Sequence, residues 1–153
     1  MLRIGVISDT HGLLRPQALE ALTGAQHLIH AGDVGAPEVL EQLRELAPVT
    51  AVRGNNDVEA WAGALPEAVT FELAGARLHL LHNLAELGVT PAKAGIHAVI
   101  AGHSHRPVLR KSEGVLYLNP GSAGPRRFSL PVSVAWLEID NGKLEARLVE
   151  LTV

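Results

Sequence analysis

Five short apolar segments of this chain each end in polar residues that can bind a metal ion. In order along the chain, these residues are Asp9 and His11, Asp33, Asn55, His82, and finally His103 and His105. In an open α/β sheet the carboxyl ends of the strands share one edge, so residues that are distant in sequence converge there. The pattern therefore predicts a crevice at a sheet edge where seven side chains meet, which is a suitable number for two metal ions.

Length and composition favour one folded unit. With 153 residues, 47% of them apolar, the chain can bury a sizeable core, and we expect a single domain over residues 1–153. The net charge of −3, with 13 basic residues spread along the chain, argues against nucleic acid as the main partner. No apolar run is long enough for a membrane span, and the first one is too short and too charged for a signal peptide. We expect a cytoplasmic protein that does not associate with membranes.

Strand-like and helix-like segments alternate before the character of the chain changes beyond residue 105. Strands are expected at 2–8, 27–31, 49–53, 69–73, 76–81 and 97–101. Helices are expected at 15–22 and 37–47, with shorter ones at 58–65 and after Thr90-Pro91. The remaining segments look extended, at 108–111, 115–118, 132–139 and 144–153, with a hairpin signal at Asp140-Asn141-Gly142. An α/β protein with a β-rich C-terminal part is therefore predicted.

The spacing of the candidate ligands suits metal chelation. Asp9 and His11 are two residues apart beyond a strand, so both side chains can project to the same side of extended backbone. The His103 and His105 pair has the same spacing. Asp33 is the candidate bridge, because a carboxylate has two oxygens that can serve two cations. The chain contains no cysteine, so nitrogen and oxygen atoms must hold any metal.

The order and spacing of the motifs resemble those of the calcineurin-like metallophosphoesterases, and especially the small YfcE-like phosphodiesterases of bacteria and archaea. The motifs that carry the resemblance are Asp9-x-His11, Gly32-Asp33, Gly54-Asn55, His82, Gly102-His103-Ser104-His105, Asn119-Pro120-Gly121-Ser122 and Pro125-Arg126. The resemblance covers nearly the whole chain. It implies a four-layer α/β/β/α sandwich of two mixed sheets.

The resemblance also implies a centre of two divalent metal ions. One ion would be held by Asp9, His11, Asp33 and His105, and the other by Asp33, Asn55, His82 and His103. The implied function is a divalent-metal-dependent phosphohydrolase, above all a phosphodiesterase for small phosphoesters, with a metal-bridging hydroxide as nucleophile. Asp33, Asn55 and His82 are the expected catalytic residues. These imidazole, carboxylate and amide ligands fit manganese best in our reading, with nickel, iron, cobalt or zinc as alternatives, and fit magnesium less well.

Two features bear on the substrate. Arg126 is the expected substrate-binding residue, with Arg127 beside it, because a guanidinium can neutralise phosphate oxygens with two donors. In many related enzymes the asparagine ligand is followed by a histidine that protonates the leaving group, and Asn56 stands at that position here. We expect Asn56 to contact substrate and diesters with good leaving groups to be favoured. Asp57 is a conceivable substitute acid.

A second departure from the family pattern concerns the loop at His82. The sequence there is Leu81-His82-Asn83, where relatives often carry a glycine after the ligand. If the backbone cannot bring the imidazole to the ion, the centre is effectively mononuclear. The histidines outside the motifs, including His30, are expected to be satisfied strand residues, and Arg53 is expected to brace its loop.

Two other functions stay open at this point. One is a non-catalytic protein-binding scaffold on the same fold, as in the retromer subunit that resembles these enzymes but has a degraded first metal motif. The intact His11 argues for the enzyme. The other is a nuclease, for which neither the length nor the charge of the chain supplies a DNA-binding surface. The sequence discloses neither the substrate nor the quaternary state, and a homo-oligomer is one alternative.

Overall fold

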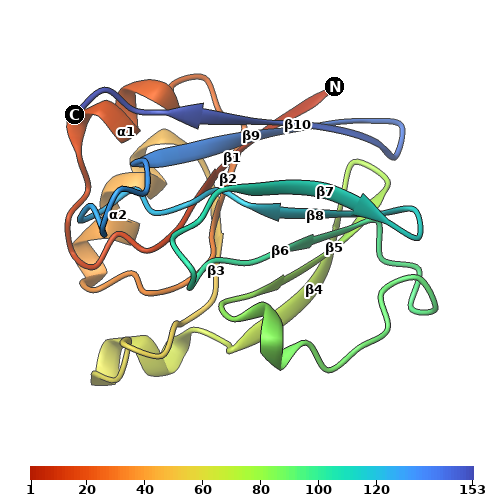
Figure 1. Cartoon of the computed structure of the whole chain (residues 1–153), viewed down its shortest axis with the longest axis horizontal. Coiled ribbons are helices and arrows are strands. Elements are labelled where there is room, and N and C mark those ends of the chain that lie inside the picture. Colours follow the sequence, from red (N-terminus) through yellow and green to blue (C-terminus); the bar gives the residue numbers. More distant parts are fainter.

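The computed structural model describes all 153 residues, and it contains two five-stranded sheets that pack face to face (Figure 1). The first sheet has the order β10-β9-β1-β2-β3. Its strands are β1 (Leu2–Ile7), β2 (His27–His30), β3 (Val49–Ala51), β9 (Ser133–Asp140) and β10 (Lys143–Glu150). β1, β2 and β3 are parallel, whereas β9 is antiparallel to both β1 and β10.

The second sheet has the order β4-β5-β6-β8-β7. Its strands are β4 (Ala68–Leu73), β5 (Ala76–Leu81), β6 (Ala98–Ile100), β7 (Val108–Ser112) and β8 (Val115–Asn119). The three central strands are parallel, and the two edge strands pair with them in the antiparallel sense. Both sheets are therefore mixed, as the resemblance implied.

The main core lies between the two sheets. Strand residues alternate between faces, so Ile4 and Val6 of β1 point inward together with Leu78 and Leu80 of β5, all fully buried. Fifteen buried residues form this cluster. At about 1.5–3 kcal/mol for each large side chain, their burial is the main force that holds the sheets together.

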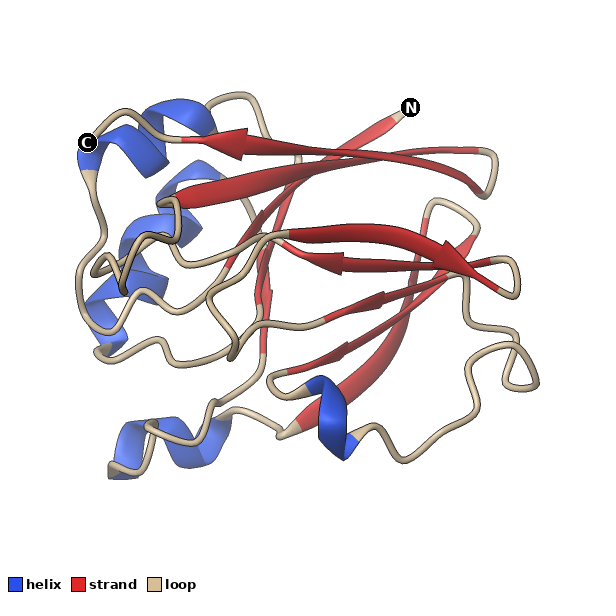
Figure 2. Ribbon diagram, viewed as in Figure 1, coloured by secondary structure: helices blue, strands red, loops and turns tan.

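Two α-helices cover the outer face of the first sheet, and both lie on the left of Figure 2. α1 (Pro16–Ala21) and α2 (Pro37–Leu46) each begin with proline, which fits the first helical turn because its backbone lacks an N–H. The buried face of α2 consists of Val39, Leu40 and Leu43. This helix is where the spacing of apolar residues predicts it.

The outer face of the second sheet has no α-helix. It is covered by η2 (Leu84–Glu86), a 3₁₀ turn, and by the loop that ends at Ile96, which packs with Val99 and Val115. The helix predicted after Thr90-Pro91 is wrong, because residues 91–95 form turns and Gly95 takes a φ of 71°. Three residues between Pro91 and the left-handed Gly95 are too few to propagate a helix. The fourth layer of the sandwich is thus a thin one.

Local signals elsewhere in the chain give mixed results. The hairpin between β9 and β10 is confirmed, with Asn141 and Gly142 at φ values of 49° and 78°, as a tight primed turn requires. The short helix predicted at 58–65 is a 3₁₀ helix, η1 (Ala60–Ala64). No helix in the structure combines the length and apolar character needed to cross a membrane.

Candidate metal centre

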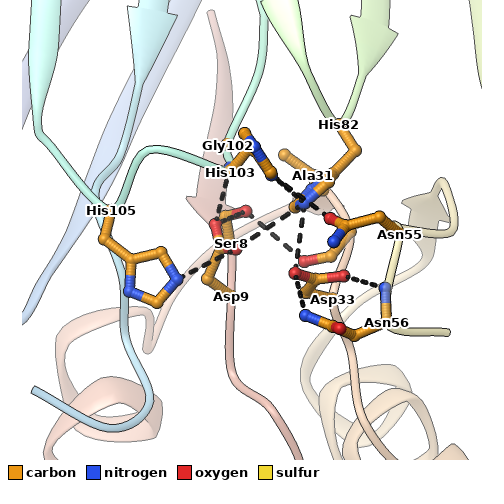
Figure 3. A network of polar contacts seen from close by, with 12 residues as sticks. Ser8, Asp9, Ala31, Asp33, Asn55, Asn56, His82, Gly102, His103 and His105 are labelled. Carbon is orange, nitrogen blue, oxygen red and sulfur yellow. Dashed lines mark hydrogen bonds and ion pairs between the residues drawn. The ribbon is translucent and has the colours of Figure 1, made fainter. Parts of the chain in front are cut away.

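The loops that follow five strands bring the seven candidate ligands into one space. Figure 3 shows Asp9, Asp33, Asn55, His82, His103 and His105 there. Asp9 and His11 follow β1, Asp33 follows β2, Asn55 follows β3, His82 follows β5, and His103 and His105 follow β6. Most of these side chains are buried. The site therefore lies where the ends of strands from both sheets meet.

One group of side chains consists of Asp9, His11 and His105, whose nearest nitrogen and oxygen atoms all lie within 4.8 Å of one another. His105 Nε2 is 3.4 Å from Asp9 Oδ1 and 3.3 Å from His11 Nε2. Asp33 Oδ2 is 3.8 Å from His11 Nε2. This is the set that the resemblance implied for the first ion.

A second group lies around His82. Its Nε2 atom is 3.2 Å from Asp33 Oδ2 and 3.3 Å from His103 Nδ1. His103 Nδ1 is in turn 3.2 Å from the amide oxygen of Asn55. Asp33 Oδ2 thus lies between the two groups, where a bridging carboxylate has to be. Asp9 Oδ1 also approaches His82 Nε2, at 3.9 Å.

Asp9 Oδ1 is the strongest sign that the donor set fits a cation. Asp9 is fully buried, and this oxygen has no hydrogen-bond partner. A buried carboxylate oxygen without a partner costs free energy that a positive charge beside it recovers. Ser8 Oγ donates to the other oxygen, Oδ2, at 2.7 Å, and the His103 backbone N–H donates to it at 3.1 Å. The protein thus holds one oxygen and leaves the other to face the imidazoles.

The backbone at the ligands is not extended, and the geometry we expected for the two residue pairs is wrong. Asp9, His11, Asp33, His103 and His105 all have φ between 47° and 72°. Only a minority of non-glycine residues adopt this left-handed region, and strain of this kind concentrates at functional sites. Each pair converges because left-handed residues turn the loop, not because a strand continues.

Close packing leaves room only for glycine at position 102. A Cβ atom there would collide with Ser8 Oγ and lie 2.6 Å from Asp9 Oδ2. The residue therefore lets the loop after β6 approach the loop after β1. The absence of a side chain at this position thus avoids a collision with the carboxylate of a candidate ligand.

Asp33 is held in its ionised form. Asn56 donates to it twice, from the backbone N–H to Oδ1 at 2.9 Å and from Nδ2 to Oδ2 at 3.1 Å. Burial alone would raise the pKa of Asp33, but hydrogen bonds from His82 and from the Asn56 backbone outweigh it and lower the pKa. Asn56, expected to bind substrate, is seen here orienting Asp33.

The imidazole of His82 is oriented by the carbonyl oxygen of Ala31. His82 Nδ1 donates to that oxygen at 2.7 Å, which leaves Nε2 to face Asp33. Burial lowers the pKa of His82, but the Asp33 hydrogen bond and the Asp9 charge outweigh it, so the pKa is raised. The Leu81-His82-Asn83 departure therefore does not keep the ring from the site.

Asp57 is a structural residue and not a substitute acid. It is 5% exposed, and its carboxylate accepts three backbone N–H groups, from Val34 at 3.0 Å, Gly35 at 3.0 Å and Gly54 at 2.9 Å. These bonds tie the loop that carries Asp33 to the loop that carries Asn55. Because its two oxygens accept these three fixed backbone N–H groups, Asp57 is poorly placed to deliver a proton to a leaving group.

His30 and Thr10 form a second brace below the site. The Gly32 N–H donates to His30 Nδ1 at 3.1 Å, so the ring proton is on Nε2, which donates to Thr10 Oγ1 at 3.0 Å. Thr10 Oγ1 donates to the Val34 carbonyl at 2.8 Å. The expectation of a satisfied strand histidine is confirmed.

The late motif Asn119-Pro120-Gly121-Ser122 also braces the site. Asn119 Nδ2 donates to the Gly102 carbonyl at 3.0 Å and to Ser104 Oγ at 3.1 Å, and Ser122 Oγ donates to the Asp9 carbonyl at 3.0 Å. These partners are distant in sequence, so single-sequence reasoning found no signal for them.

The arginines differ in their relation to the site. Arg126 and Arg127 are exposed, and neither side chain makes a hydrogen bond or ion pair. Burial lowers the pKa of His105, and the charge of Asp9 raises it. The charge of Arg127 lowers it further, which means that Arg127 lies near the centre. No contact brings Arg126 to the seven ligands. Arg53 braces its loop as expected, donating to the Leu65 carbonyl at 2.6 Å.

Residues 2–142 match the calcineurin-like phosphoesterase superfamily domain, and the chain belongs to that family. It is 36% identical to a probable metallophosphoesterase of Methanothermobacter thermautotrophicus over 95% of its own length and 91% of the relative. It is 28% identical to a phosphodiesterase of Methanocaldococcus jannaschii, over 78% of this chain and 83% of that one.

Solved structures with the same fold include both a phosphoesterase and a vacuolar protein sorting protein. YfcE, a phosphoesterase from E. coli, is 26% identical with a TM-score of 0.71, and the match covers 99% of this chain and 100% of YfcE. Vps29 of Chaetomium thermophilum is 20% identical with a TM-score of 0.78, over 98% and 97% of the two chains. The fold expected from the sequence is confirmed, and the family is one of metal-dependent phosphoesterases.

Proposed function

We propose that this protein is a divalent-metal-dependent phosphodiesterase that acts on small phosphoesters in the cytoplasm. The observation that carries the proposal is the convergence of the seven candidate ligands in one site, in which one buried carboxylate oxygen, Asp9 Oδ1, has no partner of its own. The named activities of its relatives support the same class of reaction.

The residues fit two ions. In this proposal Asp9, His11, Asp33 and His105 hold one, and Asp33, Asn55, His82 and His103 hold the other. When bound, two such cations lower the pKa of a water molecule and neutralise charge on the phosphate oxygens. Manganese is our first choice, because the ligands mix imidazoles with oxygen donors.

The chain's own part in catalysis is to fix charge and orientation. Asp33 is ionised, since its pKa is lowered, and two hydrogen bonds from Asn56 fix its orientation, so it can bridge two cations without first losing a proton. The Ala31 carbonyl fixes the ring of His82, and the amide oxygen of Asn55 adds a ligand without adding negative charge. Arg127 is better placed than Arg126 to neutralise a bound phosphate.

The preference for diesters with good leaving groups follows from the lack of a placed acid. Asn56 occupies the position of the protonating histidine and is engaged with Asp33. Asp57 is engaged with three backbone N–H groups. A leaving group that departs as a stable anion, such as 4-nitrophenolate, needs no proton.

Hydrolysis of bis(4-nitrophenyl) phosphate tests the proposal. We expect the purified protein to hydrolyse it with added Mn²⁺ and to lose activity on chelation with EDTA. Asp33→Asn should abolish turnover with an unchanged circular dichroism spectrum. Asp140→Asn is the matched control, because Asp140 is an exposed carboxylate in the β9–β10 turn. Activity that survives thorough chelation contradicts the proposal.

A protein-binding scaffold is the second candidate, and the fold shared with Vps29 is the observation that keeps it. The same assay separates the two. A scaffold would bind Mn²⁺ but hydrolyse no phosphoester, whereas an enzyme hydrolyses the diester only when the metal is present.

A further inference from the structure

An apolar cavity of about 180 Å³ lies directly beside the metal centre, on the outer face of the second sheet. Its walls include Leu84 of η2, Val99 and Ala101 at the end of β6, Val108 of β7 and Tyr117 of β8. This hollow is open at the surface beside η2, where Leu84 is 38% exposed.

The cavity and the candidate ligands share a wall. Gly102 and His103 line the cavity, and Nδ1 of the same His103 lies 3.3 Å from His82 Nε2. A group bound in the cavity is therefore one side chain away from the place where a phosphate would bind. An ester group attached to that phosphate can therefore reach the cavity.

Tyr117 of β8 contributes an aromatic side chain to the cavity wall, and Arg110, which stacks on its ring, lines the same cavity. Tyr117 is half-buried, and the guanidinium carbon of Arg110 lies 4.4 Å from the centre of its ring. The arginine holds the ring in place by a cation–π contact. A fixed aromatic side chain with aliphatic neighbours binds another flat ring by offset or edge contacts.

A second cavity, which His82 helps to line, differs in chemistry. It has a volume of about 260 Å³ and is lined by Arg53, Asn55, Glu67 and Glu86, so it is polar and charged. Asn83 lines both cavities. The two ester groups of a diester thus meet unlike surroundings, and an apolar ring has only one suitable place.

We propose that the cavity formed by Leu84, Val99 and Tyr117 binds an aromatic ester group of the substrate, so that the natural substrates are phosphodiesters with a planar ring. This inference rests on the proposed function. The volume agrees with it, because drug-sized ligands occupy about 300–1,000 Å³, whereas this cavity holds a single ring.

Two phosphonates test the cavity without any reaction. Phenylphosphonate and methylphosphonate carry the same anionic group on a P–C bond that hydrolysis leaves intact. By isothermal titration calorimetry of the Mn²⁺-loaded protein, we expect phenylphosphonate to bind about tenfold more tightly, as partial burial of a ring predicts. Equal affinities would overturn the inference.

A matched pair of leucine variants tests whether the preference for phenylphosphonate depends on the cavity. Leu84→Ser removes an apolar wall and should reduce the preference for phenylphosphonate to about threefold or less. Leu109→Ser is the control, since Leu109 is 39% exposed on β7 and does not line the cavity. It should leave the tenfold preference intact. A loss of preference in both variants, or in neither, would contradict the inference.

Turnover separates the inference from the function on which it rests. Leu84→Ser should raise the KM for bis(4-nitrophenyl) phosphate several-fold with a smaller change in kcat, while Leu109→Ser changes neither. If the wild type hydrolyses the diester but binds both phosphonates equally, the cavity inference is wrong and the enzyme stands. If it binds phenylphosphonate preferentially, in a manner that depends on Leu84, but hydrolyses nothing, the function is wrong and the binding site stands. Failure to bind either phosphonate contradicts the inference.

Discussion

The protonation of His30 should make the stability of this protein depend on pH. His30 is fully buried, and its two ring nitrogens are used by Gly32 and Thr10. A second ring proton would have to reside on Nδ1, which accepts the Gly32 N–H. That hydrogen bond would be lost, and a positive charge would be buried in the loop that carries Asp33.

The size of the effect follows from the pKa. Burial, which outweighs the attraction of Asp57 and Asp33, lowers the pKa of His30 from 6.5 to about 3. Between these values the unfolded chain binds a proton that the folded chain does not, so stability falls as the pH falls. The contribution is fully present above pH 6.5. At about 1.4 kcal/mol for each pH unit, acidification from pH 8 to 4.5 removes about 3 kcal/mol through this residue.

Urea unfolding followed by circular dichroism measures this dependence. The experiment uses EDTA throughout, so that metal release does not contribute, and compares the wild type with His30→Gln. Glutamine keeps a donor and an acceptor but has no titrating group. We expect the variant to be less stable at pH 8 by about 1–2 kcal/mol and to lose less stability on acidification. The two curves should cross at about pH 5–6, and the variant should be the more stable protein at pH 4.5.

His97→Gln is the control for the titration of other histidines, because His97 is exposed. It should follow the wild-type curve. Parallel curves for His30→Gln and the wild type would refute the reasoning, since they would mean that His30 binds its proton equally well in the folded and unfolded chains.

Three further predictions test the loops of the centre. Asp57→Asn should lower the free energy of unfolding by about 2–3 kcal/mol in urea titrations, because an amide cannot accept all three N–H groups. If the variant instead loses turnover at unchanged stability, Asp57 acts as an acid. Gly102→Ala should weaken Mn²⁺ binding and lower the midpoint of urea unfolding, because the new Cβ atom would collide with Ser8. Gly63→Ala is the control and should leave both quantities unchanged, because a Cβ atom at position 63 would have no atom within 4 Å. Calorimetric titration should find two Mn²⁺ ions per wild-type chain and one in Asn55→Ala, and a stoichiometry of one in both would show that the centre is mononuclear.

Much of the architecture was predictable because it depends on local patterns. The apolar runs of β1 and β5 predict buried strands, and the Asn141-Gly142 pair predicts a hairpin. These signals need no knowledge of the rest of the chain. The helix expected after Thr90-Pro91 failed because its only support was a start signal, with no apolar periodicity behind it.

The site was predictable in its members but not in its geometry. Ligand types at strand ends and their family order identify which residues meet. The left-handed backbone of Asp9 and Asp33 was not predicted, because neither residue type requires it. The structural role of Asp57 was not predicted for a related reason, since two of its three donors, at positions 34 and 35, are more than twenty residues away.

The sequence by itself determined which side chains are available for metal and phosphate chemistry and which strands deliver them, because residue type and hydrophobic period are local properties of the chain. Only the tertiary structure decided that Asn56 orients Asp33, that one oxygen of Asp9 has no partner, and that an apolar cavity adjoins His103. The reason is physical: a hydrogen bond, a desolvated atom or a cavity wall depends on groups from several loops, and folding alone brings those groups together.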